Sequence, residues 1–207
     1  MNSNKINNNF VYLISPNKIR DKKFYNDLTL IFKSGKVSFF QLRLKKETNK
    51  NKLIIGKKIK KICNKFKVKF LVNDNPKLAE ELNADGCHLG QKDMNIQEAR
   101  KILKNKIIGI TCHNSVKLAE EAIKNGADYL AFGAFYSTKT KVTKYYANTK
   151  ILSWSKNNVK VPVVAIGGIT DKNYSNLIEN GADLIAISSF IWRNKDKLKA
   201  VKSFNKN

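Results

Sequence analysis

Short apolar runs alternate with amphipathic stretches along the chain, and this alternation predicts its secondary structure. Eight of the runs are rich in β-branched or aromatic side chains and end at turn residues, which is typical of buried strands. These predicted strands are FVYLIS (10–15), SFFQLRL (38–44), KFLVND (69–74), GCHLG (86–90), IIGITCH (107–113), DYLAFGAF (128–135), PVVAIGGI (162–169) and DLIAISSF (183–190). The segments between them place apolar residues at helical spacing, so a helix is expected after each strand.

The segment SVKLAEEAIKNG (115–126) shows this helical spacing most clearly. Its apolar side chains fall on one side of a helix, at Val116, Leu118, Ala119, Ala122 and Ile123. Asn114-Ser115 offers an N-cap, and Gly126 suits the C′ position at the other end. We therefore predict a capped helix between the fifth and sixth strands.

Three predicted helices end in related sequences, LNADGCHLG (82–90), NGADYLAFG (125–133) and NGADLIAIS (180–188). In each of them the chain leaves a helix, turns on Gly or Asn, and enters a strand. We call the shared element, Ala-Asp preceded by Gly or Asn, the Ala-Asp turn. It is interpreted as a structural connection without a catalytic role.

Eight strands that alternate with eight helical segments, at a spacing of about 25 residues, predict a (β/α)₈ TIM barrel of the α/β class. A doubly wound open sheet uses the same alternation but more often has five or six strands. No linker separates a second domain. We expect residues 1–207 to form a single (β/α)₈ barrel domain, with residues 1–9 as a flexible N-terminal tail.

The composition indicates one cytoplasmic domain. A chain of 207 residues that is 42% hydrophobic can bury one substantial core. No apolar run approaches the roughly 20 residues of a membrane span, and the first ten residues contain no apolar signal-peptide core. Cys63, Cys87 and Cys112 lie in apolar segments without C-x-x-C spacing, which predicts reduced core thiols rather than a disulfide or zinc site.

The charge raises the question of a nucleic-acid partner. Forty Lys and Arg oppose 16 Asp and Glu, for a formal net charge of +24. A non-catalytic basic nucleic-acid-binding protein is therefore one alternative. The lysines are spread over the whole chain, however, and no stacked-aromatic module or DNA-binding motif accompanies them. Codon bias explains abundant Lys, Asn and Ile equally well, so small anionic substrates are the favoured partners and neither nucleic acid nor membrane is expected.

Polar residues collect where the predicted strands end. Active sites of (β/α)₈ barrels are built at this end of the strands, so these side chains are expected to face one mouth. They are Gln41, Arg43, Lys45, Asn73, Asp74, Gln91, Asp93, Thr111, His113, Ser137, Thr138, Lys139, Thr140, Lys141, Ser188 and Ser189, and the seventh strand ends at Gly167 and Gly168. His88 lies in the middle of the fourth strand instead, which predicts a hydrogen-bonded interior imidazole.

Asp74 and Asp93 follow two successive strands and form a candidate metal site. Mg²⁺ is often bound by one or two carboxylates together with phosphate oxygens and water. The alternative is that each aspartate merely caps the helix that follows it. Asp74 precedes Asn75-Pro76, where either Asp74 or Asn75 is a suitable N-cap with Pro at the first helical position. Spacing alone leaves both readings open.

The segments STKTK (137–141) and IGGI (166–169) predict a phosphate pocket. Hydroxyls, a lysine and glycines that let backbone N–H groups approach an anion meet the needs of a phosphate. The loops after the seventh and eighth strands form the common phosphate site of these barrels. Arg43, Lys45, Lys141 and a metal exceed what one phosphate needs, so a second and more highly charged phosphate group is expected beside it.

Seven motifs occur in order: QLRLK (41–45), VND (72–74), DGCHLGQKD (85–93), IGITCHN (108–114), FGAFYSTKTK (132–141), PVVAIGGIT (162–170) and ISS (187–189). Together they resemble the thiamine phosphate synthase family across nearly the whole chain. The resemblance implies a transferase of thiamine biosynthesis with a (β/α)₈ fold. Such an enzyme condenses 4-amino-2-methyl-5-(diphosphomethyl)pyrimidine with 4-methyl-5-(2-phosphoethyl)thiazole, giving thiamine phosphate and pyrophosphate.

The resemblance also implies roles for individual residues. The implied ligands of the pyrimidine diphosphate are Gln41, Leu42, Arg43, Leu44, Lys45, Asn73, Thr111 and Lys141. Mg²⁺ is the implied cofactor, and Asp74 and Asp93 are its implied ligands. The implied ligands of the thiazole phosphate are Thr138, Lys139, Thr140, Gly168, Ser188 and Ser189.

The chemistry implied by the resemblance needs no protein nucleophile. The diphosphate departs first, and the thiazole nitrogen captures the pyrimidinylmethyl cation. The catalytic residues would be Arg43, Lys45 and Lys141, which neutralise the departing charge. Asn75 stands where the family often has Arg, and Ala134 and Ser137 stand where it often has Pro. The sequence leaves homo-oligomerisation open.

A second alternative is a thiazole tautomerase of the same superfamily, which isomerises the thiazole phosphate without joining it to a pyrimidine. It resembles the synthases around IGGIT but typically lacks the aspartate pair and the T-x-T-K run. Because both features are present here, the synthase reading is favoured.

Overall fold

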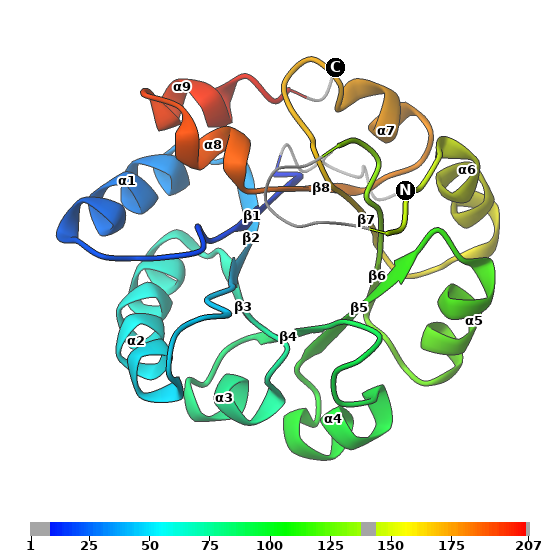
Figure 1. Ribbon diagram of the computed structural model, residues 1–207, viewed down its shortest axis with the longest axis horizontal. Helices are drawn as coiled ribbons and strands as arrows, with labels where there is room; N and C mark the ends of the chain where they lie inside the picture. Colours follow the sequence, from blue (N-terminus) through cyan, green and yellow to red (C-terminus); the bar gives the residue numbers. More distant parts are fainter. Residues whose placement is uncertain (1–8, 138–143, 206–207) are drawn as a thin grey trace, which may run out of the picture.

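The computed structural model describes residues 9–137 and 144–205. Within them, eight parallel strands close into a barrel in chain order, and helices surround the strands (Figure 1). The predicted (β/α)₈ fold is confirmed. The predicted tail, residues 1–9, lies outside the described residues except for Asn9. Within the part of the chain that is described, no helix is both long and apolar enough to cross a membrane.

The strands are β1 (Val11–Ile14), β2 (Val37–Leu42), β3 (Lys69–Asn73), β4 (Gly86–Leu89), β5 (Ile107–His113), β6 (Tyr129–Phe132), β7 (Val163–Ile166) and β8 (Leu184–Ile187). The helices are α1 (Lys22–Lys33), α2 (Asn49–Phe66), α3 (Pro76–Glu81), α4 (Ile96–Leu103), α5 (Val116–Lys124), α6 (Thr149–Asn158), α7 (Ser175–Glu179), α8 (Ser189–Arg193) and α9 (Lys197–Lys202).

Several strands end earlier than the apolar runs that predicted them. The eighth run, 183–190, leaves the sheet after Ile187, and α8 begins at Ser189. Periodicity does not separate a short buried strand from a buried helical turn, so the predicted strand DLIAISSF extends past the true end of β8. The extra short helix makes nine helices among the described residues, one more than the alternation predicts. It lies directly after β8, at the mouth of the barrel.

The predicted caps of α5 are confirmed. The Ser115 hydroxyl accepts a hydrogen bond from the Leu118 N–H at 3.2 Å. At the other end, Gly126 follows the C-cap Asn125 with φ at +86°, a backbone conformation that glycine adopts without steric cost.

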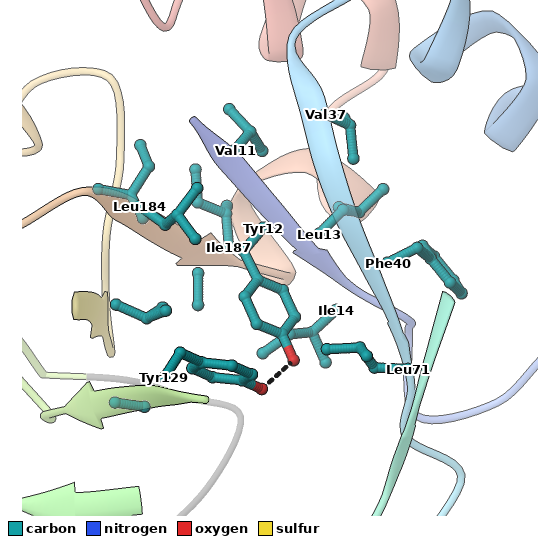
Figure 2. Packing of buried hydrophobic residues seen from close by; sticks show 14 of the residues in the cluster. Val11, Tyr12, Leu13, Ile14, Val37, Phe40, Leu71, Tyr129, Leu184 and Ile187 are labelled. Carbon is teal, nitrogen blue, oxygen red and sulfur yellow. Dashed lines mark hydrogen bonds between the residues drawn. The ribbon is translucent and has the colours of Figure 1, made fainter. Parts of the chain in front are cut away.

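The core has two layers, one inside the barrel and one between the strands and the helices. All four residues of β1, β4, β6 and β8 are buried, because both faces of a parallel strand are covered. Inside the barrel, Tyr12 of β1 and Tyr129 of β6 point toward each other (Figure 2). Their hydroxyls are 2.8 Å apart. Since β1 pairs only with β2 and β8, this hydrogen bond crosses the interior of the barrel.

The Ala-Asp turns are structural, as predicted. The aspartates of the three turns accept hydrogen bonds from an N–H in the first two residues of an adjacent strand: Asp85 from Phe70, Asp128 from Ile108 and Asp183 from Val163, at 2.7 to 2.9 Å. Each turn therefore joins its own strand to the preceding one at the end of the barrel opposite the mouth.

Asp85 is expected to make the stability of the fold depend on pH. Burial raises its pKa, but hydrogen bonds from Lys60 and the Phe70 N–H, with the Lys60 and Lys69 charges, outweigh this and hold the pKa below its ordinary value. Its ionised form therefore stabilises the fold above about pH 4, and that contribution is lost as the pH falls through the lowered pKa. Urea unfolding should show Asp85→Asn less stable than the wild type at pH 7, with the gap narrowing below about pH 4.

Asp171→Asn is the control, because Asp171 is an exposed aspartate outside these turns. The control should stay within about 0.5 kcal/mol of the wild type throughout. A gap for Asp85→Asn that is unchanged at pH 3 would refute the role given to the ionised carboxylate.

Candidate active site

The two candidate metal ligands meet at the mouth of the barrel. Asp74 follows β3, Asp93 follows β4, and their side chains lie within hydrogen-bonding reach of each other. Neither one caps a helix. Asn75 caps α3 by accepting from Leu78 N–H at 3.0 Å, and Asn95 caps α4 in the same way. Helix capping therefore does not account for either carboxylate.

The backbone explains how Asp74 is separated from the helix that follows it. Asp74 has φ at +63°, in the left-handed region, whereas an N-cap residue has an extended backbone. Aspartate tolerates this conformation better than most residues. The Asp74 N–H donates to the His88 carbonyl at 2.8 Å, which ties the end of β3 to β4. This turn brings the Asp74 carboxylate to the Asp93 side.

Charges of both signs surround the aspartate pair. Lys45 Nζ lies 3.0 Å from Asp74 Oδ2. Burial, reinforced by the neighbouring Asp74 carboxylate and opposed by the Gly90 N–H, raises the pKa of Asp93. That N–H donates to Asp93 Oδ2 at 2.7 Å. Burial also lowers the pKa of Arg43, and the Asp74 charge opposes that shift. The pair thus carries a repulsion that a bound cation would relieve.

The donor set suits a hard divalent cation. Among the described residues, no group of three or more His, Cys, Asp and Glu side chains gathers to hold a metal. A tetrahedral zinc site built from such ligands is therefore not found there. Two carboxylates that leave the remaining positions to water and phosphate oxygens match the usual protein contribution to Mg²⁺.

The side chains of the QLRLK motif (41–45), at the end of β2, lie partly at the mouth and partly in the core. Arg43 is half-buried and Lys45 is exposed, beside the aspartates. Leu42 and Leu44 are buried in the core, and both also line the cavity that contains Asp74 and Lys45, where they offer apolar contact only. Gln41 is also buried, and its Nε2 donates to the Tyr12 hydroxyl at 2.7 Å inside the barrel. Only the two cations of this motif have side chains open to a bound anion.

The candidate phosphate pocket is partly described. Gly167 and Gly168 have φ of +105° and +64°, and a Cβ on Gly168 would lie 2.4 Å from the Ser137 carbonyl oxygen. Glycine is thus required for the β7 loop to pack against the start of the β6 loop. Ser188 and Ser189 are half-buried where β8 passes into α8. The predicted ligands Thr138, Lys139, Thr140 and Lys141 lie outside the described residues.

Thr111 lies near the end of β5, half-buried, and its hydroxyl bonds to His88 Nε2 at 2.9 Å. The other ring nitrogen of His88 bonds to the Tyr129 hydroxyl at 2.7 Å. Burial lowers the pKa of His88 to about 4, so the imidazole is neutral at physiological pH. The prediction of an interior, hydrogen-bonded His88 is confirmed. Asn73 ends β3 in register with His88, next to Asp74.

Tyr12 and Tyr129 were missed in the sequence, because a tyrosine in an apolar run has no mark that separates an interior hydroxyl from ordinary core packing. Only the inward-facing position of each tyrosine on its strand could have suggested that its hydroxyl lies inside the barrel.

Two shallow cavities flank the aspartate pair. One of about 290 Å³ includes Asp74 with Lys45, Lys52 and Asn73 in its lining. The other, of about 220 Å³, includes Asp93 and Gly90. The side bearing Lys45 and Lys52 is the more cationic of the two, which favours an anionic group there.

Comparisons with known proteins agree with the resemblance in the motifs. A sequence model of the family described as thiamine monophosphate synthase matches residues 11–191. A thiamine-phosphate synthase of Pelagibacter ubique is 66% identical over 206 residues, covering 100% of this chain and 99% of the relative. One of Rhodospirillum centenum is 38% identical, covering 95% of this chain and 96% of the relative.

Solved structures show the same fold. A thiamine phosphate pyrophosphorylase from Pyrococcus furiosus superposes with a TM-score of 0.83 at 30% identity, covering 97% of this chain and 95% of that one. A 3-hexulose-6-phosphate synthase from Salmonella typhimurium has a TM-score of 0.70 at 15% identity, covering 93% of this chain and 95% of that one. The second likeness concerns the fold alone.

Proposed function

The chain belongs to the thiamine monophosphate synthase family, and from this premise we propose how its rim residues join a pyrimidinylmethyl diphosphate to a thiazole phosphate. The aspartate pair and the cations beside it take the diphosphate. The glycines after β7 and the serines after β8 take the phosphate of the thiazole. The products are thiamine phosphate and pyrophosphate.

The observation that carries this proposal is the contact between Asp74 and Asp93 with Lys45 and Arg43 around it. Two carboxylates held together at a barrel mouth repel the anionic substrate unless a cation lies between them. We propose that Asp74 and Asp93 hold Mg²⁺. When bound, Mg²⁺ supplies positive charge that stabilises the departing diphosphate.

The protein's own residues have three tasks in this scheme. Arg43 and Lys45 bind diphosphate oxygens and stabilise the negative charge that grows on them as the bond to carbon breaks. Gly168, Ser188 and Ser189 anchor the thiazole phosphate through backbone N–H and hydroxyl groups. The two anchors fix the thiazole nitrogen in line with the reacting carbon, which replaces the need for a nucleophilic side chain. We also propose a role for Lys141 on the diphosphate, from the family pattern.

A thiazole tautomerase remains the nearest alternative for a barrel with this phosphate pocket. A tautomerase binds no diphosphate, so it does not need a metal site at the two aspartates or the cations Arg43 and Lys45 beside them. Two relatives that match almost the whole chain are thiamine-phosphate synthases. We further propose that the protein acts in the cytoplasm, since Cys63, Cys87 and Cys112 are all buried free thiols.

A pyrophosphate-release assay tests the function. The purified protein should release pyrophosphate only when the pyrimidine diphosphate, the thiazole phosphate and Mg²⁺ are all present. Excess EDTA should abolish the release, and added Mg²⁺ should restore it. Conversion of the thiazole phosphate to an isomer without any pyrophosphate would favour the tautomerase instead.

A further inference from the structure

A continuous chain of hydrogen bonds runs through the barrel from β2 to β5. It links the side chains of Gln41, Tyr12, Tyr129, His88 and Thr111 in that order, at 2.7, 2.8, 2.7 and 2.9 Å. We call the first four of these residues the interior chain. All four are buried, and only Thr111, at the end, reaches the half-buried rim. Nothing in the proposed mechanism uses the interior chain.

The amide of Gln41 sets the direction of every bond in the chain. Its Nε2 only donates, so the Tyr12 oxygen accepts and the single Tyr12 proton goes to Tyr129. The Tyr129 proton then goes to His88 Nδ1. A neutral imidazole with an accepting Nδ1 carries its proton on Nε2, which donates to Thr111 Oγ1.

These bond directions determine how the Thr111 hydroxyl is oriented. Because its oxygen accepts from His88, its own hydroxyl proton cannot point at the imidazole and is turned away from the interior. Thr111 lies on the same rim as Asp93, with its backbone carbonyl accepting from the Gln91 side chain. The rim side of Thr111 is where the pyrimidine diphosphate is placed by the proposed function.

The backbone of β5 is shaped to admit the interior chain. Gly109 lies beside Tyr129, and a Cβ on Gly109 would lie 1.8 Å from Cζ of the Tyr129 ring. The same ring stacks on His88, with centroids 5.6 Å apart and planes inclined by 18°. A side chain on Gly109 would displace the ring that carries this hydroxyl. The position of the Tyr129 hydroxyl is therefore fixed from two sides.

We propose that the interior chain positions Thr111, turning its hydroxyl proton toward a hydrogen-bond acceptor of the pyrimidine diphosphate. The acceptor is a ring nitrogen or a diphosphate oxygen, both of which bring a lone pair to a single fixed donor. His88 and the two tyrosines are positioning residues that touch no substrate themselves. This inference rests on the proposed function.

Steady-state kinetics of Tyr129→Phe test the proposal, because this change removes one hydroxyl and keeps the stacked ring. With Mg²⁺ and thiazole phosphate saturating, we expect about a tenfold lower kcat/KM for the pyrimidine diphosphate. The KM for the thiazole phosphate should stay within twofold of the wild type. If Tyr129→Phe does not fold, Tyr12→Phe interrupts the same chain and takes its place.

The double variant Tyr129→Phe with Thr111→Val separates positioning from a general structural role. Once Thr111→Val has removed the hydroxyl, the interior chain has nothing to position. Adding Tyr129→Phe to Thr111→Val should therefore lower kcat/KM by less than a further twofold. Tyr174→Phe is the matched control, since the Tyr174 hydroxyl bonds to the Asn205 backbone and its ring stacks on Phe10, just before β1, away from the interior chain. It should leave kcat/KM within twofold of the wild type.

Two results would overturn the proposal. One is a loss in Tyr129→Phe no larger than in Tyr174→Phe, and the other is a double variant whose loss equals the product of the two single losses. A wild-type protein that releases no pyrophosphate would instead refute the proposed function, so the two failures are distinct.

NMR spectroscopy can determine the direction of the hydrogen bonds in the interior chain, and it needs no enzymatic turnover. The protein has only two histidines, so ¹⁵N spectra of the imidazole rings are simple to assign. The proton of His88 should be on Nε2, and a proton on Nδ1 would contradict the proposed direction. Inhibition by inorganic pyrophosphate then identifies the acceptor. If the acceptor is a diphosphate oxygen, Tyr129→Phe should weaken this inhibition. If the acceptor is a ring nitrogen, Tyr129→Phe should leave the inhibition unchanged.

Discussion

Asp93→Asn is expected to lower pyrophosphate release by about 100- to 1,000-fold at saturating Mg²⁺. The substitution keeps an oxygen that can accept from the Gly90 N–H, so the turn after β4 is preserved. It removes one of the two charges that we assign to the metal. With Asp74 already paired to Lys45 at 3.0 Å, the remaining carboxylate attracts the cation weakly. The measurement is the release rate with both substrates present, at increasing Mg²⁺.

Asp128→Asn is the matched control for this loss of charge. Asp128 accepts from the Ile108 N–H at the far end of the barrel, and the amide of Asn can accept the same bond. The control should turn over within about twofold of the wild type. Near-normal turnover of Asp93→Asn would remove Asp93 from the metal site.

Gly109→Ala is expected to destabilise the fold by about 3 kcal/mol, a large share of the stability of a domain this size. The new Cβ would lie 1.8 to 2.4 Å from three carbons of the Tyr129 ring, closer than any real contact allows. The ring cannot simply turn away, since its hydroxyl bonds to both Tyr12 and His88. Urea unfolding followed by circular dichroism measures the change.

Gly56→Ala makes the same substitution where the neighbour can move. A Cβ on Gly56 would approach the side-chain end of Leu82, which is flexible, and Ala is favoured over Gly within a helix such as α2 by about 1 kcal/mol. We expect a change of less than about 1 kcal/mol there. Equal losses for the two variants would show that the interior of the barrel is not rigid around Tyr129.

Local patterns in the sequence were enough to predict the barrel and the place of the rim. Periodicity finds strands and helices, and a parallel barrel brings all strand ends to one mouth whatever the details of the loops. That is why Asp74 and Asp93, which are 19 positions apart in the numbering, were expected together. Their contact is a consequence of β3 and β4 being neighbours.

Other features depend on geometry that local patterns do not contain. Whether Asp74 or Asn75 caps α3 was decided by the left-handed backbone of Asp74, which the sequence Asp-Asn-Pro does not reveal. The contact of Tyr12 with Tyr129 joins residues 117 positions apart and forms only when the barrel closes. Alternation assigns each tyrosine to a face of its strand, but it does not give the partner across the interior.

A crystal structure of the protein with thiamine phosphate, pyrophosphate and Mg²⁺ would show whether Asp74 and Asp93 hold the metal. We expect a metal ion bound by the carboxylates of Asp74 and Asp93 and by pyrophosphate oxygens, with Arg43 and Lys45 on the same pyrophosphate. A metal ion bound elsewhere, or a pyrophosphate lying away from these four side chains, would contradict it.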